Sequence, residues 1–462
     1  MDRVVIAVIY VIFWAALMMA AVMPRGVVAV SDDDADKYAV PVMEIELDGV
    51  TLDEVHENGK DVKYAGSIVE LPGEVFDNVE FKGRGNFSWA VDKKSYRLKF
   101  DSKVELLGME KSKKWALVAN YVDDSLMRND LGQYLMGMMV EDYPFQGEFV
   151  ELVVNGGDLG VYYVVRTMDI SKEAVDLRDT GGVLAELDNV YCGAEEKRYI
   201  ASNGDCFTVK DIVNEDNQEQ VMTDFVRQYD ELLEAIARKD YAAISSLIDV
   251  ESFAKYFIVS EMAANPDAYV TSWFMYKGDA DDKIHADLAW DYDASFGNLD
   301  WGNGDWPEGF YAPTVGLSRL EYTYEKNGMG GFCDYDKSRP MMETVNVSLT
   351  MCRLLDVPEF MVVVGEVYRE KMAGRGEEIV WHIDARAAEI KVAAEKDAEL
   401  WGKGDFEEAV EYLKWWIEER MEFFEETYVN GGAGDEDEWL VPVENEGYIL
   451  EEDEVFLLEE IS

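Results

Sequence analysis

The sequence predicts an α+β fold, with a β-rich N-terminal part followed by a mainly helical C-terminal part. Segments of alternating polar and apolar residues, separated by turn signals such as Pro72-Gly73, are typical of strands and lie at 42–48, 62–71, 79–84 and 95–100. Helical periodicity predicts helices at 217–239, 251–264, 341–355, 358–373, 376–400 and 405–428. The chain is 48% hydrophobic and 12% aromatic, which is enough to bury a large core.

The middle of the chain mixes both kinds of element. Asp124-Ser125 can cap a helix that runs to about residue 140, with an apolar side that includes Leu131 and Leu135. Segments 148–154 and 160–166 predict a hairpin around the turn sequence at 155–158. Asn265-Pro266 ends the helix at 251–264, and strands are expected at 270–276 and 283–292.

The N-terminal 31 residues indicate export. Residues 4–23 carry no charge, and small residues around Ala29 and Ser31 precede an acidic segment. This pattern predicts a cleaved signal peptide, with an uncleaved membrane anchor as the alternative. Cleavage is favoured because the acidic segment lacks the basic flank of a stop-transfer sequence. We therefore expect a body at 32–430 that is secreted or lies on the cell surface, and a weakly ordered acidic tail at 431–462.

Four cysteines are compatible with disulfides in an exported protein. They are Cys192, Cys206, Cys333 and Cys352, which allow three pairings. Short loops favour Cys192–Cys206 and Cys333–Cys352, and four buried free thiols are the alternative. The chain has no CxxC motif and three histidines, which argues against a zinc site or a histidine-centred triad.

Charge is distributed unevenly along the chain. The formal net charge is −54, which argues against general nucleic-acid binding. Residues 82–114 nevertheless hold ten Lys and Arg against four Asp and Glu, a local excess of six positive charges. The commonest cause of such a basic segment is a phosphate or another multivalent anion. The alternative is a basic strand and turn that pair with surrounding carboxylates.

The order of residues inside this basic segment favours a site. Alternation over 95–100 places Tyr96, Leu98 and Phe100 on one strand face and Arg97 with Lys99 on the other. Upstream, two glycines flank Arg84, so backbone amides can approach an anion there. The pattern is neither a Walker loop nor a complete GxGxxG fingerprint.

Three aspartates form a second group far along the chain. Asp267 follows Asn265-Pro266 at the mouth of the next strand. If 291–293 is extended, Asp291 and Asp293 share a face and can ligate Mg²⁺ or Mn²⁺. Salt bridges to Lys or Arg, or a structural calcium loop, are the alternatives. Cations for a polyphosphate, aspartates for a metal and an aspartate to orient a hydroxyl are the parts that phosphoryl transfer needs.

A series of motifs in a fixed order resembles the CotH kinase family, named for spore coat protein H. The resemblance is strong over about 79–300 and looser to about 428. The motifs are Arg84-Gly85-Asn86, Lys94 to Phe100, Leu107-Gly108-Met109, Lys113 to Leu117, Asp124 to Asn129, Glu151-Leu152, Asn155-Gly156, Leu159 to Tyr163, Asn265 to Tyr269, Trp290 to Asp293 and Phe296-Gly297-Asn298.

The resemblance implies an atypical protein-kinase-like fold in a secreted or surface-associated enzyme. Such kinases transfer phosphate from ATP to serine in partner proteins, here surface or coat proteins, with a divalent metal, Mg²⁺ or Mn²⁺. It implies Asp267 as catalytic base or hydroxyl-orienting residue, Asp291 as metal ligand and Asp293 as a second ligand. The implied nucleotide-binding residues are Lys94, Arg97 and Lys99, supported by Arg84 and Arg128, with Glu151 as an ion-pair partner.

Two departures from the family pattern keep other functions open. Arg166-Thr167 follows the strand at 160–166 where an acidic residue is usual, and 285–289 lacks the usual Gly-Pro. A non-catalytic pseudokinase or surface binding protein is the first alternative. A carbohydrate-active enzyme with paired carboxylates is the second, although a neutral glycan gives no reason for the basic segment.

Overall fold

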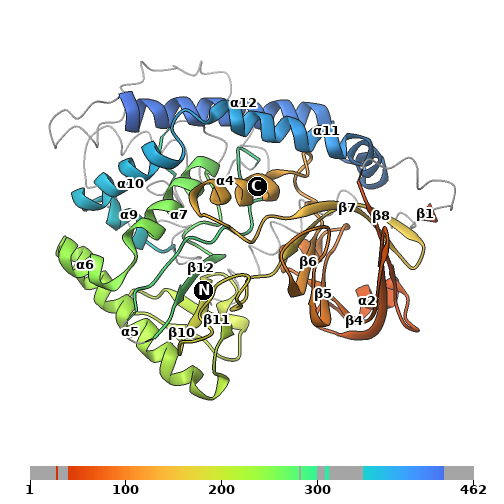
Figure 1. Ribbon diagram of the computed structural model, residues 1–462, viewed down its shortest axis with the longest axis horizontal. Coiled ribbons are helices and arrows are strands. Elements are labelled where there is room, and N and C mark those ends of the chain that lie inside the picture. The colour runs from red at the N-terminus through yellow and green to blue at the C-terminus, as the bar shows by residue number, and fades with distance from the viewer. Residues whose placement is uncertain are drawn as a thin grey trace, which may run out of the picture.

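The computed structural model describes residues 28–29, 40–279, 282–298, 307, 309–311 and 347–430. Within them a β-rich N-terminal part is followed by a mainly helical C-terminal part, as predicted (Figure 1). The acidic tail at 431–462 and nearly all of the predicted signal segment lie outside the described residues. Among the helices that are described, none combines the length and the apolar composition needed to cross a bilayer.

The N-terminal part is a sheet that closes on itself. Its described strands follow the order β1-β8-β6-β5-β4-β3-β2-β7, and β7 pairs with β8 as well as with β2. The β2–β7 pairing is parallel and the other pairings are antiparallel. The strands are β1 (Val28–Ala29), β2 (Val42–Glu46), β3 (Tyr64–Leu71), β4 (Glu74–Arg84), β5 (Ser95–Val104), β6 (Ser112–Val118), β7 (Glu148–Val154) and β8 (Gly157–Arg166).

The two faces of this sheet have different roles. Tyr96, Leu98 and Phe100 lie in a core cluster inside the closed sheet, together with Phe81 and Trp115. The strand alternation predicted for 95–100 is therefore correct, because the residues between them must face outward.

The outward face carries the cations. Lys82 lies opposite Arg97, and Arg84 lies opposite Ser95, in the β4–β5 register. On the next strand Ala116 is opposite Arg97 and belongs to the core cluster shared with the helices. The basic face of the sheet is thus turned toward the helical part.

Two short helices lie between strands of this sheet, one between β2 and β3 and one between β4 and β5. They are α2 (Leu52–Asn58), which begins with a capping box at Thr51 and Glu54, and α3 (Phe87–Ala90). The larger α4 (Arg128–Met139) starts later than predicted, after Met127. The predicted cap at Asp124-Ser125 is wrong because Asp123 accepts hydrogen bonds from the backbone N–H groups of Ser125 (2.9 Å) and Arg128 (2.8 Å), which makes a turn before the helix.

A second sheet begins the helical part. Its order is β10-β11-β9-β12, formed by β9 (Val183–Leu187), β10 (Tyr199–Ile200), β11 (Cys206–Ile212) and β12 (Trp273–Lys277). The strand predicted at 283–292 is reduced to single bridges at Ile284 and His285. The predicted Cys192–Cys206 disulfide is present. Cys352 is also disulfide-bonded, and its predicted partner Cys333 lies outside the described residues.

The remaining helices agree with their predicted ranges, with two exceptions. The helix predicted at 341–355 is confirmed for its last six residues, and α6 (Tyr241–Leu247) was not predicted. The first exception is α9 (Thr350–Leu355), and the helices that agree are α5 (Gln218–Ala237), α7 (Val250–Ala263), α10 (Pro358–Lys371), α11 (Gly376–Trp401) and α12 (Phe406–Glu425).

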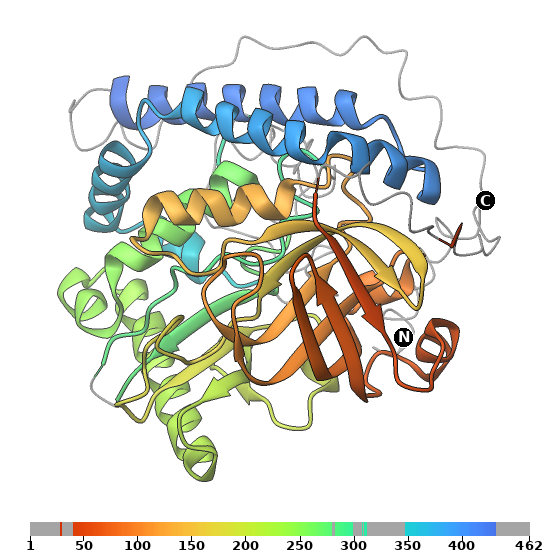
Figure 2. The same cartoon turned by 45° about the vertical axis from the view of Figure 1, so that its right-hand side comes forward.

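Helices α11 and α12 lie side by side across the molecule and connect its two parts (Figures 1 and 2). The Lys93 ammonium, just before β5, is 2.5 Å from Asp397 Oδ1 on α11, and both side chains are buried. Arg386 of α11 pairs with Asp130 of α4 at 3.1 Å and with Glu148 of β7 at 2.9 Å. These ion pairs hold the closed sheet in a fixed position against the helical part.

Candidate active site

Asp267 lies in a tight turn between α7 and β12. Ala264 ends α7 in the left-handed conformation, and the Asp267 N–H donates to Asn265 Oδ1 at 2.9 Å. The Asp267 carbonyl then accepts from the N–H groups of Val270 (3.1 Å) and Thr271 (2.9 Å). The turn that Asn265-Pro266 predicts therefore places Asp267 between helix and strand, and its backbone polar groups are used.

The backbone at Asp291 differs from the prediction. A strand was expected at 283–292, with shared ligation by Asp291 and Asp293 if 291–293 was extended, but Asp291 has φ of +67°, in the left-handed region. Asn265 Nδ2 donates to the Asp291 carbonyl at 3.2 Å, and the Tyr292 N–H donates to Asn129 Oδ1 at 2.8 Å. A non-glycine residue at positive φ costs free energy and is retained where surrounding contacts hold it, often at a functional site.

The three predicted aspartates interact electrostatically. Burial, then Asp291 and Asp188, raise the pKa of Asp267 to about 7. Burial raises the pKa of Asp291 as well, and burial with the charges of Asp291 and Asp267 raises the pKa of Asp293 well above its usual range. Like charges shift one another in this way when they share a poorly hydrated space. The structure thus brings Asp267, Asp291 and Asp293 together, as the sequence predicted.

Arg84 is a cation whose charge acts directly on this aspartate cluster. Its guanidinium lies over the Trp290 ring, 5.2 Å from the ring centroid. Burial lowers the pKa of Arg84, while the charges of Asp291 and Asp293 oppose that shift. In return, Arg84 is the largest influence that lowers the pKa of Asp291. The glycine-flanked arginine of the basic segment therefore faces the aspartates from the other part of the fold.

Arg97 belongs to the same surface. Its guanidinium is 3.5 Å from Glu80 Oε1, and its positive charge acts on both Arg84 and Lys82. The Nε of Arg97 is buried without a hydrogen-bond partner among the described residues. Arg84 and Arg97 together make a cationic surface on the outward face of β4 and β5.

Lys94 and Lys99 occupy different surroundings. The Lys94 ammonium donates to the carbonyls of Trp89 (3.0 Å) and Val91 (2.9 Å), at the end of α3. Lys99 is exposed and lies opposite Glu80 and Lys114 in the strand register. The contacts described for Lys94 are thus local. Lys99 is open to solvent and lies four residues beyond Ser95, the β5 residue that is opposite Arg84.

Arg128 borders the aspartate cluster through a neighbour. Its guanidinium forms a buried ion pair with Asp123 and donates to Ser125 Oγ at 3.2 Å. Asp123 is one of the charges that raise the pKa of Asp293. Arg128 therefore supports the turn at Asp123, whose charge acts on Asp293.

Glu151 lies in a separate ion-pair group. The Lys396 ammonium of α11 is 3.4 Å from Glu151 Oε1 and 2.8 Å from Asp158 Oδ2. The other carboxyl oxygen of Glu151 is buried without a described hydrogen-bond partner. Burial is the main cause that raises the pKa of Glu151 to about 7. Glu151 is therefore in an ion pair, but with Lys396 of α11, which is not one of the cations predicted to bind the nucleotide.

Three further charged residues lie in or near the site and were not predicted as site residues. Lys93, not Lys94, is the buried lysine before β5. Glu186 and Asp188, at the end of β9, add negative charge beside Asp267 and Asp291. The signal for Asp188 was an acid and an amide, Asp188-Asn189, directly after a short apolar strand.

The donor set suits a metal that is shared with phosphates. No group of three or more His, Cys, Asp or Glu in the described ranges is arranged to hold a metal ion by itself. Mg²⁺ commonly takes one or two carboxylates and completes its shell with water and substrate phosphates. Asp291 and Asp293 are two half-buried carboxylates whose charges repel each other, and a divalent cation would relieve that repulsion.

A family model described as CotH kinase protein matches residues 81–424, which is most of the chain. No curated protein matches the chain. The matched range includes the end of β4 from Phe81 to Arg84, all of β5 and the three aspartates of the cluster.

Proposed function

This chain belongs to the CotH kinase family, and from that membership we propose that it is an exported protein serine kinase that uses ATP and Mg²⁺ or Mn²⁺. Its acceptors would be serine-containing surface or coat proteins. The observation that carries this proposal is the juxtaposition of Arg84, at the end of β4, with Asp291 and Asp293, which lie in the segment after β12. A cation facing two carboxylates is the arrangement needed to hold a metal-bound polyphosphate.

Each residue has a role that its surroundings support. Arg84 and Arg97 would contact the phosphates, because the charges of Asp291 and Asp293 act on Arg84 and the charge of Arg97 acts on Arg84 from the same strand face. Asp291 and Asp293 would hold the metal, which supplies charge neutralisation on the transferring phosphoryl group. Asp267, with a pKa of about 7, would orient the serine hydroxyl and accept its proton on the carboxylate. Lys94, Lys99, Arg128 and Glu151 remain predicted contributors to nucleotide binding.

Phosphate incorporation from labelled ATP into a serine-containing acceptor tests the proposal. The wild-type chain should incorporate phosphate when Mn²⁺ or Mg²⁺ is present, and Asp267→Asn and Asp291→Asn should each lose at least about 100-fold in kcat. Asp77→Asn is a matched control, because Asp77 is exposed on β4 away from the cluster. Undiminished incorporation by Asp291→Asn would remove the metal assignment.

A non-catalytic binding protein is the second candidate, because the chain departs from the family pattern at Arg166. The structure explains that residue as a buried anchor: its guanidinium donates to Asp169 Oδ1 at 3.0 Å and to Ser171 Oγ at 3.1 Å. Arg166 thus has a role in packing and is not one of the charges described around Asp267. Metal-dependent ATP binding without any phosphate transfer would favour the binding protein.

A further inference from the structure

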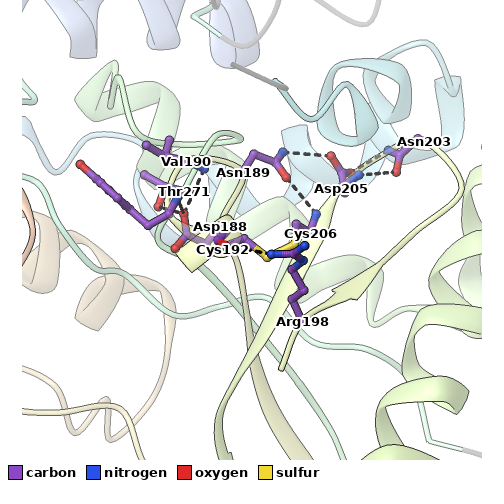
Figure 3. The surroundings of a disulfide bond; sticks show 11 residues. Asp188, Asn189, Val190, Cys192, Arg198, Asn203, Asp205, Cys206 and Thr271 are labelled. Atoms are coloured by element: carbon purple, nitrogen blue, oxygen red, sulfur yellow. Dashed lines mark hydrogen bonds between the residues drawn. A yellow bond between two sulfur atoms is a disulfide. The ribbon is translucent and has the colours of Figure 1, made fainter. Parts of the chain in front are cut away.

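Asp188 is fixed by three hydrogen bonds to one of its oxygens. Asp188 Oδ1 accepts from the N–H groups of Val190 (3.1 Å) and Tyr191 (2.8 Å) and from Thr271 Oγ1 (3.0 Å), as Figure 3 shows. Asp188 is 6% exposed. A carboxylate with this many donors on one oxygen has a single preferred orientation.

The Thr271 end of this contact lies in the turn that carries Asp267. The Thr271 N–H donates to the Asp267 carbonyl at 2.9 Å, so one residue connects the two aspartates through its hydroxyl and its amide. The Asn189 N–H also donates to the Val270 carbonyl at 2.8 Å. Two adjacent hydrogen bonds therefore join the end of β9 to the Asp267 turn.

The disulfide loop holds the other side of Asp188. The Asp188 N–H donates to the Cys206 carbonyl at 2.9 Å, and the Cys206 N–H donates to Asn189 Oδ1 at 2.9 Å. Cys206 is bonded to Cys192, one residue beyond Tyr191 (Figure 3). The segment 188–192 is thus held at both ends, and Asp188 cannot move without disturbing Thr271.

We propose that Asp188 and Thr271 act as a positioning pair that fixes the orientation of Asp267 toward the acceptor hydroxyl. The pair rests on the proposed function, in which Asp267 orients and deprotonates that hydroxyl. Asp188 acts through Thr271 and through its charge, without contacting the substrate. Small misplacements of a reacting group are costly, because catalysis by orientation depends on sub-ångström geometry.

The charge of Asp188 has a second effect at the same place. It is the third influence that raises the pKa of Asp267, after burial and Asp291. The other titratable groups around Asp267 are Asp293, whose pKa Asp267 raises, and Tyr256, which responds to the charge of Asp267. Removing the negative charge at position 188 should lower the pKa of Asp267, because one of the anions that oppose its ionisation is lost.

Substitutions at Thr271 separate positioning from packing. Thr271→Val removes the hydroxyl and keeps the shape, whereas Thr271→Ser keeps the hydroxyl. Steady-state phosphorylation should show a kcat about 10-fold lower or more for Thr271→Val with the KM for ATP within about 2-fold, and near wild-type values for Thr271→Ser. Equal kcat in Thr271→Val and the wild type would overturn the proposal.

Asp188→Asn tests the electrostatic part, because an amide oxygen can still accept the three hydrogen bonds. The acidic limb of the pH–rate profile should move to lower pH by about half a unit or more. An unchanged limb would contradict the proposal. Loss of metal-dependent ATP binding in Asp188→Asn would also overturn it, since Asp188 would then be a ligand.

A readout without turnover separates this inference from the proposed function. The ¹³C resonance of the Asp267 carboxyl, assigned in the full chain by its loss in Asp267→Asn, can be titrated in the wild type and in Asp188→Asn. A lower titration midpoint of Asp267 in Asp188→Asn supports the Asp188–Thr271 positioning pair, even if no acceptor is phosphorylated. If no acceptor is phosphorylated, the proposed function alone fails. Identical midpoints with normal phosphorylation would refute the pair alone.

Discussion

The guanidinium of Arg84 lies over the indole ring of Trp290, the residue that directly precedes Asp291. Arg84 ends β4, and Trp290 belongs to the segment after β12, so this contact joins the cationic face of the sheet to the aspartate cluster. Stacking on an aromatic face holds a guanidinium in one plane and leaves its edge free for a carboxylate or phosphate.

Replacing Arg84 should weaken nucleotide binding. Arg84→Ala is expected to raise the Kd for ATP with Mn²⁺ by roughly 10-fold, about 1.4 kcal/mol, and Arg84→Lys should recover part of the loss because an ammonium lacks the planar fork. Isothermal titration calorimetry measures the difference. The control is Arg178→Ala, which removes an exposed arginine paired with Asp176. Equal Kd values for Arg84→Ala and the control would rule out a phosphate contact.

Activity should depend on pH through Asp267. Because the pKa of Asp267 is about 7, kcat should fall as the pH drops below 7 and the carboxylate takes up a proton. Asp77→Asn, which removes an exposed carboxyl on β4 outside the cluster, is the control and should keep the limb in place. A profile that stays flat from pH 8 to pH 5.5 would exclude Asp267 as the base.

The order of elements and the composition of the site could be predicted from local patterns. Periodicity gave α5, α7, α10 and α11 to within a few residues, since each has an apolar side that must be buried. The Asn265-Pro266 break likewise identified the turn at Asp267, because proline restricts the residue before it.

Geometry that depends on distant contacts could not be predicted in this way. The left-handed backbone of Asp291 is held by Asn265, which lies 26 residues earlier. The Asp291 carboxylate accepts a hydrogen bond from Ser272 Oγ at 3.3 Å. The pairing of Lys93 with Asp397 spans 304 residues. No local window contains such partners, so neither the buried pairing of Lys93 nor the left-handed backbone of Asp291 could be predicted.

Removing charge from Asp293 should stabilise the fold in the absence of metal. Its raised pKa means that the folded chain binds the proton more tightly than the unfolded chain, so stability is lost as the pH rises above about 4 and Asp293 is forced to ionise. Asp293→Asn should raise Tm by about 1 to 3 °C at pH 7.5 in chelator, with a smaller gain at pH 4.5. Differential scanning calorimetry measures both values. A lower Tm at pH 7.5 would show that the carboxylate is stabilising.

The Lys93–Asp397 pair should be costly to break from one side. Both side chains are buried, and the Lys93 ammonium also donates to the Val161 carbonyl at 2.6 Å. Lys93→Met leaves Asp397 as an unpaired buried charge and should lower the free energy of unfolding by about 3 to 5 kcal/mol. The double variant Lys93→Met with Asp397→Leu should recover most of that loss.

Urea denaturation measures the effect of the buried pair, and an exposed pair provides the control. Lys391→Met removes the partner of Glu407 on the outer surface of α11 and α12, where a change within about 0.5 kcal/mol is expected. A loss at Lys93 no larger than that at Lys391 would mean that α11 is held against the closed sheet by other contacts.

Opening the Cys192–Cys206 disulfide should weaken the fold and the site together. The bond closes a loop with a sequence separation of 14, and cross-linking a loop of about that length stabilises a protein by roughly 3 kcal/mol. Substitution is the cleaner test, because reductant would also open the disulfide of Cys352. The variant with Cys192→Ser and Cys206→Ser should unfold at lower urea and, at temperatures where it stays folded, should show a lower kcat with a similar KM for ATP. Because the loop holds Asp188 and not the phosphate-facing cations, a rise in KM with unchanged kcat would place the effect of the disulfide elsewhere in the molecule.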